Sequence, residues 1–109
     1  MMVIIKNKKE IDEIIVEKIK GKKVYLTDHC INRAMWRGID EEKIFSIFPQ
    51  FGKVFVIETK ILKYGDEGCE LFYELDENHY FAIAMIPEAD RLKIVHAIEY
   101  KRNIKQRFS

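Results

Sequence analysis

The chain of 109 residues has the usual length of one domain, with little left over for a second. Hydrophobic residues make up 48% and charged residues 34% of it, which is enough apolar material for a packed core and excludes a disordered chain. No run of about 18 apolar residues predicts a transmembrane helix, and the apolar stretch near the start is shorter than that of a signal peptide. We therefore expect a cytoplasmic protein without a membrane partner, in which Cys30 and Cys69 are reduced thiols.

The net charge is only +1, but the charges are distributed unevenly. Residues 66–90 contain eight acids and no Lys or Arg, whereas residues 91–109 contain six Lys or Arg and one acid. One interpretation is a basic side that binds a polyanion. The other is a surface that pairs with a second copy, or ion-pair networks of the kind found in thermophile proteins. The abundance of Ile, Lys and Glu and the scarcity of Gln agree with a thermophilic source.

Helical periodicity predicts three helices in the first half of the chain. Residues 3–6 are either a short strand or a lead-in to the first helix. That helix is predicted at 8–20, where apolar side chains recur at helical spacing and a glycine follows the last residue. After a short extended segment at 24–26, Thr27 or Asp28 caps a second helix that ends at a glycine, residue 38. Residue 40, an aspartate, caps a third helix that ends near residue 48, because a proline follows.

After residue 52 the apolar pattern changes from a helical period to a period of two. Four strands are predicted, at 54–57, 69–75, 79–86 and 92–100. Their short connections favour an antiparallel meander. The predicted fold is therefore α+β, with N-terminal helices packed on one face of a four-stranded antiparallel β-meander. We expect the whole chain, 1–109, to be a single domain in which 1–23 is an N-terminal helical extension.

One face of the second helix carries side chains that suit nucleic-acid chemistry. At about 100° per residue, His29, Arg33 and Arg37 fall within about 80° of one another, with Trp36 beside them. Guanidinium groups hold phosphate with two parallel hydrogen bonds, and an indole stacks on a base. An imidazole transfers protons near neutral pH. This face is therefore predicted to bind phosphate and a base, with His29 as a proton-transfer group.

The same residues have ordinary structural interpretations. Either arginine can pair with Glu41 or Glu42, or with an acid of the strand region. The indole can pack against the first helix, and the imidazole can bond to a loop carbonyl. Both interpretations stay open from the sequence.

Residues 27–39, which read Thr-Asp-His-Cys-Ile-Asn-Arg-Ala-Met-Trp-Arg-Gly-Ile, resemble the signature of domain-of-unknown-function family 4258. That family shows a Thr/Ser-x-His-Ala-x-x-Arg-x-x-x-Arg-Gly-Ile segment, then an acidic-capped helix and a β-meander. The layout agrees over 24–100, although Cys30 stands where the family commonly has alanine. The family is grouped by resemblance with the RelE/ParE-like toxin superfamily, whose members include metal-independent ribonucleases. The resemblance implies a RelE-like fold and an RNA-directed role.

The last predicted strand carries a second group of candidate residues. Strict alternation places five side chains on one side of it, namely Leu92, Ile94, His96, Ile98 and Tyr100. A histidine among apolar neighbours is most often a hydrogen-bonded core residue. In the functional interpretation His96, with Tyr100 and Arg102, forms the wall of a cleft opposite the His29 helix. Acid, base and phosphate-binding groups then lie together, as attack by a ribose hydroxyl requires.

No metal site and no cofactor are predicted. A zinc site can be written from His29, Cys30, Cys69 and His96, but their spacing matches no known ligand pattern. Four acids of the second strand region suggest either a carboxylate pair or cation site, or solvated side chains on an exposed strand face that protect a sheet edge, namely Glu70, Glu74, Asp76 and Glu77. We expect the solvated role.

Two functions of different classes follow. The leading hypothesis is a small, RelE-like, toxin-type protein that binds RNA and cleaves it without a metal ion, with an antitoxin-like protein or a second copy as further partners. The alternative is a non-catalytic nucleic-acid or protein-binding module of the same fold. Steep weakening of binding by salt is expected for phosphate contacts in either case.

Overall fold

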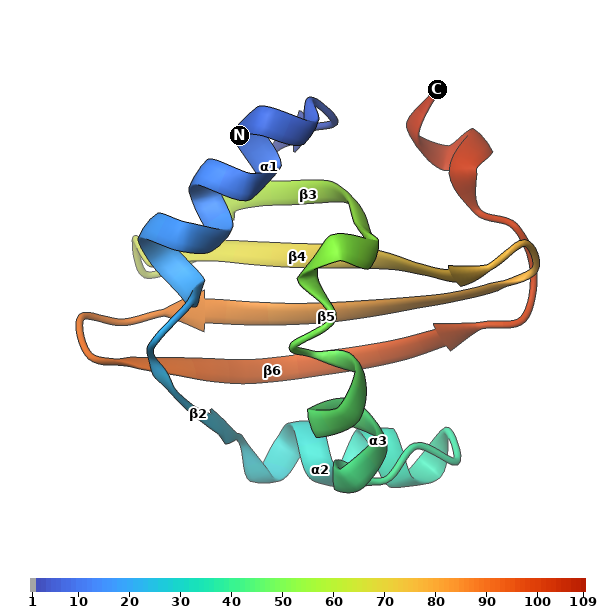
Figure 1. The fold of residues 1–109 in the computed structure, drawn as a ribbon. Coiled ribbons are helices and arrows are strands. Elements are labelled where there is room, and N and C mark those ends of the chain that lie inside the picture. Colours follow the sequence, from blue (N-terminus) through green and yellow to red (C-terminus); the bar gives the residue numbers. More distant parts are fainter. Residues whose placement is uncertain (1) are drawn as a thin grey trace.

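The computed structural model describes residues 2–109, and a six-stranded sheet lies at its centre (Figure 1). The strands are β1 (Met2–Ile5), β2 (Lys23–Leu26), β3 (Val54–Ile61), β4 (Glu67–Asp76), β5 (His79–Pro87) and β6 (Arg91–Tyr100). Their order across the sheet is β1-β3-β4-β5-β6-β2. All neighbours are antiparallel except β2 and β6, which run parallel.

The predicted α+β class is correct, but the predicted four-stranded antiparallel meander is wrong. The four strands β3 to β6 do follow one another as a meander, yet β1 and β2 add a strand at each edge, and the parallel β2 makes the sheet mixed. A short strand was one of the two alternatives for residues 3–6, but it was not included in the predicted sheet, because its side chains are mostly exposed and show no alternation. β2 was expected to be extended, but its pairing with β6 could not be predicted, because the two strands are far apart in the sequence and no short turn connects them.

The helices are α1 (Lys8–Ile14), α2 (Asp28–Trp36) and α3 (Glu41–Ile47). A π-helical turn (Ile15–Ile19) continues α1, and 3₁₀ turns occupy Phe51–Lys53 and Lys105–Phe108. The π turn is closed by a hydrogen bond of 2.7 Å from the Lys20 main-chain N–H to the Ile15 carbonyl. No helix among residues 2–109 has the length and apolar character that crossing a membrane requires.

The helices and the C-terminal segment cover different parts of the sheet (Figure 1). The larger core lies under the helices, where Ile11, Ile15 and Ile19 are at most 2% exposed. On the other face the last 3₁₀ turn packs Phe108 against Phe72 of β4, with ring centroids 4.7 Å apart. This turn covers only one end of that face, and the remainder forms the open face of the sheet.

Candidate nucleic-acid interface and sheet pocket

Local caps set the ends of α2, as the sequence predicted. The Thr27 Oγ1 accepts a hydrogen bond of 3.0 Å from the Cys30 main-chain N–H at the start of the helix. After its end, Gly38 has a φ of +75°, which glycine adopts without strain. Cys30 and Ala34 face the core and are 1% and 2% exposed. The opposite side of the helix therefore points to solvent.

Three of the predicted ligand-binding side chains line one hollow on this exposed side of α2, namely Arg33, Trp36 and Arg37. The Trp36 side chain is 90% exposed, so it does not pack against α1. The ion pairs found within residues 2–109 include neither arginine, so Glu41 and Glu42 do not neutralise them. The surface, which we call the α2 hollow, thus presents an indole beside two guanidinium groups.

Arg37 also ties α2 to the sheet. Its Nη1 donates a hydrogen bond of 3.2 Å to the main-chain oxygen of Ala97 in β6. β2 pairs with β6 only as far as Ile94, so this bond satisfies a carbonyl on the part of the β6 edge that no strand covers. A guanidinium has five N–H donors, and the remaining ones are free to hold a phosphate.

A β-bulge changes the alternation that the sequence predicted for β6. Ala84 of β5 pairs with His96, whereas the next residue, Met85, pairs with Ile94, so Val95 is an extra residue in β6. The prediction that five side chains share one side is therefore wrong. The side chains before the bulge, Leu92 and Ile94, enter the helix-covered core. The side chains after it line a pocket on the open face, namely His96, Ile98 and Tyr100.

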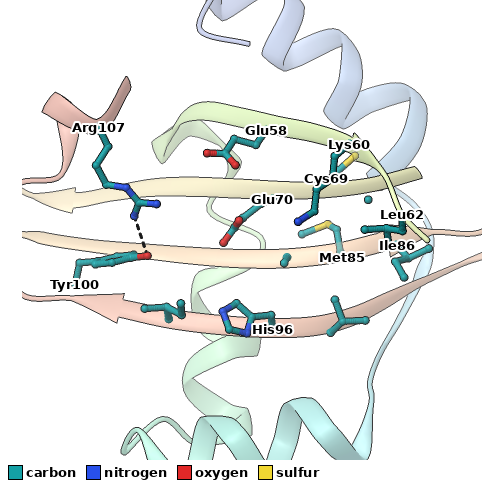
Figure 2. A pocket seen from close by; sticks show the side chains of 14 residues that line it. Glu58, Lys60, Leu62, Cys69, Glu70, Met85, Ile86, His96, Tyr100 and Arg107 are labelled. Carbon is teal, nitrogen blue, oxygen red and sulfur yellow. Dashed lines mark hydrogen bonds between the residues drawn. The ribbon is translucent and has the colours of Figure 1, made fainter. Parts of the chain in front are cut away.

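The pocket on the open face has a volume of about 390 Å³. Figure 2 shows Glu58, Glu70 and His96 on three strands along it. Strand pairing places them in one row, because Glu58 lies opposite Glu70, Glu70 opposite Ala84, and Ala84 opposite His96. The small side chain of Ala84 leaves space between the carboxyl group of Glu70 and the imidazole. We call this hollow the sheet pocket.

His96 connects the sheet pocket with the α2 hollow. Burial, followed by the positive charges of Arg37, Arg33 and His29, lowers the pKa of His96 from its ordinary value of 6.5. The imidazole is therefore neutral near neutral pH and can accept a proton. The Arg37 hydrogen bond to the main-chain oxygen of Ala97, the residue after His96, places this end of the α2 hollow beside the strand that carries His96. His29 lines neither hollow.

The wall of the sheet pocket near the C-terminus contains one predicted residue and one that was not predicted. Arg107 Nη1 donates a hydrogen bond of 3.0 Å to the Tyr100 hydroxyl (Figure 2). Its guanidinium also lies over the Tyr100 ring, 5.5 Å from the centroid. Arg102, which was predicted to take part, is exposed in the bend after β6 and is not among the residues that line this pocket.

Neither known relatives nor a metal-ligand cluster gives a further indication of the chemistry. Comparison with models of protein families, with curated proteins and with solved structures found no match. In the part of the chain from residue 2 onward, no group of three or more His, Cys, Asp or Glu side chains could hold a metal ion. Cys30 and Cys69 are free and buried, and burial raises the pKa of both thiols, which keeps them protonated and unreactive.

Of the two carboxylates of the sheet pocket, the sequence analysis did not name Glu58, and it read Glu70 as a solvated side chain. Glu70 was expected to be solvated, but it is half-buried, and burial followed by the charge of Glu58 raises its pKa from 4.5. Each acid stands among apolar residues of its strand, after Val-Ile in β3 and between Cys69 and Leu71 in β4, which was the available signal. That signal does not show that the two acids face each other, because it does not contain the register of β3 against β4.

Proposed function

We propose that the protein binds single-stranded RNA through the α2 hollow and cleaves it without a metal ion. The observation that carries this proposal is the 90% exposed Trp36, which shares one hollow with Arg33 and Arg37. An indole left in water forgoes the stabilisation that burial of its apolar surface gives. Beside two guanidinium groups, it suits an unpaired base that stacks on the ring while the arginines hold the flanking phosphates.

The charge pattern of the two arginines supports binding of phosphate. Arg33 makes no ion pair with the acids described, and Arg37 uses one nitrogen for the Ala97 carbonyl. Both therefore retain N–H donors in the planar geometry that matches two phosphate oxygens. Each phosphate neutralised in this way releases counterions from a single strand. Binding should accordingly weaken as the salt concentration rises.

Cleavage is the second part of the proposal. Neutral His96 takes the proton of a ribose 2′-hydroxyl, whose oxygen attacks the phosphorus. The bond from phosphorus to the 5′-oxygen breaks, and the leaving oxygen takes a proton from His29 as the general acid, so the product carries a 2′,3′-cyclic phosphate. Arg33 and Arg37 stabilise the charge that develops on the phosphate. The resemblance of residues 27–39 to family 4258, and through it to RelE/ParE-like toxins, supports a toxin-like ribonuclease acting in the cytoplasm.

The second candidate is a non-catalytic module that binds a protein, either an antitoxin-like protein or a second copy. The edge strand β1 favours it, because Met2, Val3 and Ile4 are 55%, 46% and 40% exposed. An exposed apolar edge can add a strand from another chain. Light scattering at low and high salt tests self-association, with Val3→Lys as the variant that should abolish it. A wild-type monomer at both salt concentrations removes the second copy from consideration.

The single tryptophan of the chain gives a direct test of RNA binding. Titration with a short single-stranded RNA should quench the Trp36 fluorescence as a base stacks on the indole. In an assay with labelled RNA, Trp36→Ala should weaken binding by about tenfold, because stacking contributes ~1–3 kcal/mol per base. Met35→Ala is the matched control, since Met35 is a 65% exposed apolar residue on the same helix but lines a different hollow. Equal effects of the two substitutions would contradict RNA binding at the α2 hollow.

Cleavage is tested separately by incubation of the protein with RNA in EDTA. We expect fragments with 2′,3′-cyclic phosphate ends from the wild type and none from His96→Gln. Retained RNA binding by His96→Gln shows that the variant is folded. If the wild type binds RNA but leaves it intact, the catalytic part of the proposal is wrong and the binding part stands.

A further inference from the structure

Two carboxyl groups of the sheet pocket, those of Glu58 and Glu70, lie on neighbouring strands, and neither belongs to an ion pair found among residues 2–109. Glu58 and Glu70 are directly paired residues of the antiparallel strands β3 and β4. Like charges in this relationship destabilise a sheet. The ion pairs of residues 2–109 engage other acids, namely Asp12, Glu67, Glu74, Glu88 and Glu99. The charges of Lys60 and Arg107 on the same pocket lining offset part of this repulsion at Glu70 without forming an ion pair. The acceptor oxygens of both carboxyl groups therefore suit a ligand that donates hydrogen bonds.

The remaining lining of the sheet pocket suits a flat aromatic ligand. Its volume of about 390 Å³ is within the range of roughly 300–1,000 Å³ that is typical of small-molecule sites. Ala84 and Ile98 contribute apolar lining, and Lys60 and Arg107 also line the pocket and carry N–H donors. The pocket therefore combines hydrogen-bond acceptors, an apolar surface and hydrogen-bond donors.

Among the RNA bases, guanine alone presents two adjacent N–H donors on its pairing edge. Adenine and cytosine place a ring-nitrogen acceptor beside their amino group, which a carboxylate would repel, and uracil places one N–H between two carbonyl oxygens. A pair of carboxylates, which only accept when ionised, selects the guanine edge. The guanine O6 and N7 atoms are acceptors, for which Lys60 and Arg107 offer donors.

We propose that the sheet pocket holds a guanine base of the bound RNA, with Glu70 and Glu58 accepting hydrogen bonds from its N1–H and 2-amino groups. This inference rests on the proposed RNA binding by the α2 hollow. The two sites are neighbours, because Arg37 of the α2 hollow hydrogen-bonds the main-chain oxygen of Ala97, the residue that follows His96 of the sheet pocket. One RNA strand can thus place a phosphate on α2 and its guanine in the pocket. The site gives the protein a base preference that the α2 hollow, which stacks any base, does not supply.

The test compares three pentanucleotides that differ only at the central base, which is adenine, guanine or hypoxanthine. They carry 2′-O-methyl groups, so they cannot be cleaved through the 2′-hydroxyl. We expect the guanine strand to bind wild-type protein about tenfold more tightly than the adenine strand, since one bidentate contact gives discrimination of this order. Hypoxanthine lacks the 2-amino group and should lose most of that advantage.

Glu70→Gln should remove the preference for guanine and leave the affinity for the adenine strand unchanged, because the amide keeps the size of the side chain but replaces one acceptor with a donor. Glu77→Gln is the matched control. It makes the same change in charge, but Glu77 is exposed in the turn between β4 and β5, away from the pocket lining, so this variant should retain the preference.

The outcomes separate this inference from the function on which it rests. If the wild type binds all three strands equally, or if Glu70→Gln keeps the preference, the guanine site is overturned while RNA binding stands. If no strand binds, the proposed function is overturned. Titration with guanosine and adenosine monophosphates then tests the pocket alone. Equal affinity for the two nucleotides overturns the guanine site. A preference for guanosine monophosphate that Glu70→Gln removes supports it.

Discussion

The Arg37 guanidinium donates a hydrogen bond of 3.2 Å to the main-chain oxygen of Ala97. This contact joins the exposed face of α2 to the free edge of β6, just beyond the bulge that directs His96 into the sheet pocket. One side chain therefore contributes both to the position of α2 and to the positive charge of the α2 hollow. Arg33, four residues earlier in the same helix, has no such contact with the sheet.

Arg33→Ala and Arg37→Ala should separate binding from stability. Both variants remove a phosphate-binding group, so each should weaken RNA binding and lower the steepness of its salt dependence by about 0.7 in a logarithmic plot. Arg37→Ala also removes the bond to the Ala97 carbonyl and should cost about 1 kcal/mol of the free energy of unfolding. Arg33→Ala should cost less than about 0.5 kcal/mol. Urea unfolding measures the difference, and equal stability losses would show that the Arg37 bond contributes nothing.

Tyr73→Phe should destabilise the protein without changing its function. The Tyr73 hydroxyl donates a hydrogen bond of 2.8 Å to the Phe48 carbonyl and is fully buried. Its removal leaves that carbonyl without a partner, so we expect a loss of about 1 kcal/mol in the free energy of unfolding. Tyr64→Phe is the control, because Tyr64 is 86% exposed. RNA binding should be the same for both variants, since neither residue lies in the α2 hollow or lines the sheet pocket.

The elements that the sequence predicted are those whose signals are local. Thr27 and Asp40 accept hydrogen bonds from main-chain N–H groups three residues later, as their cap positions required. The side chains that share one face of α2 could also be predicted, because helical geometry alone places Arg33, Trp36 and Arg37 together. The exposure of Trp36 could not, because it depends on what packs around the helix.

The remainder depends on contacts between distant parts of the chain. Nothing near Val95 indicates that it is the extra residue of a bulge, yet the bulge decides which face His96 occupies. The half-burial of Glu70 depends on the register of β3 against β4. Arg107 reaches the sheet pocket only because the C-terminal turn folds back over the sheet, so the nearer Arg102 was the natural choice from the sequence.

Glu99 should make stability depend on pH in the acid range. Burial opposes its ionisation, but hydrogen bonds of 2.6 Å from Lys43 and 2.5 Å from His79 outweigh burial, and its pKa lies below 4.5. Because the folded state holds the proton less tightly than the unfolded state, this stabilisation is complete above about pH 4.5 and is lost as the pH falls through the lower, folded-state pKa. Glu99→Gln should flatten that part of the stability profile, whereas Glu77→Gln should not. A wild-type profile that is flat at acid pH would contradict the role of Glu99.

The titration of His96 tests whether the α2 segment and the sheet pocket are neighbours. NMR of the three histidine side chains, assigned by substitution, should give His96 a pKa below 6.5. Burial contributes to this lowering and so do the charges of Arg37 and Arg33, so the double variant Arg33→Ala/Arg37→Ala should raise the pKa of His96 while leaving the contribution of burial. The unfolded chain takes up a proton as the pH falls through about 6.5, before folded His96 does. The free energy of unfolding should therefore decrease over this range for the wild type, and this decrease should be smaller for His96→Gln. An unchanged His96 pKa in the double variant would mean that the two arginines lie too far from the pocket to serve the same RNA strand.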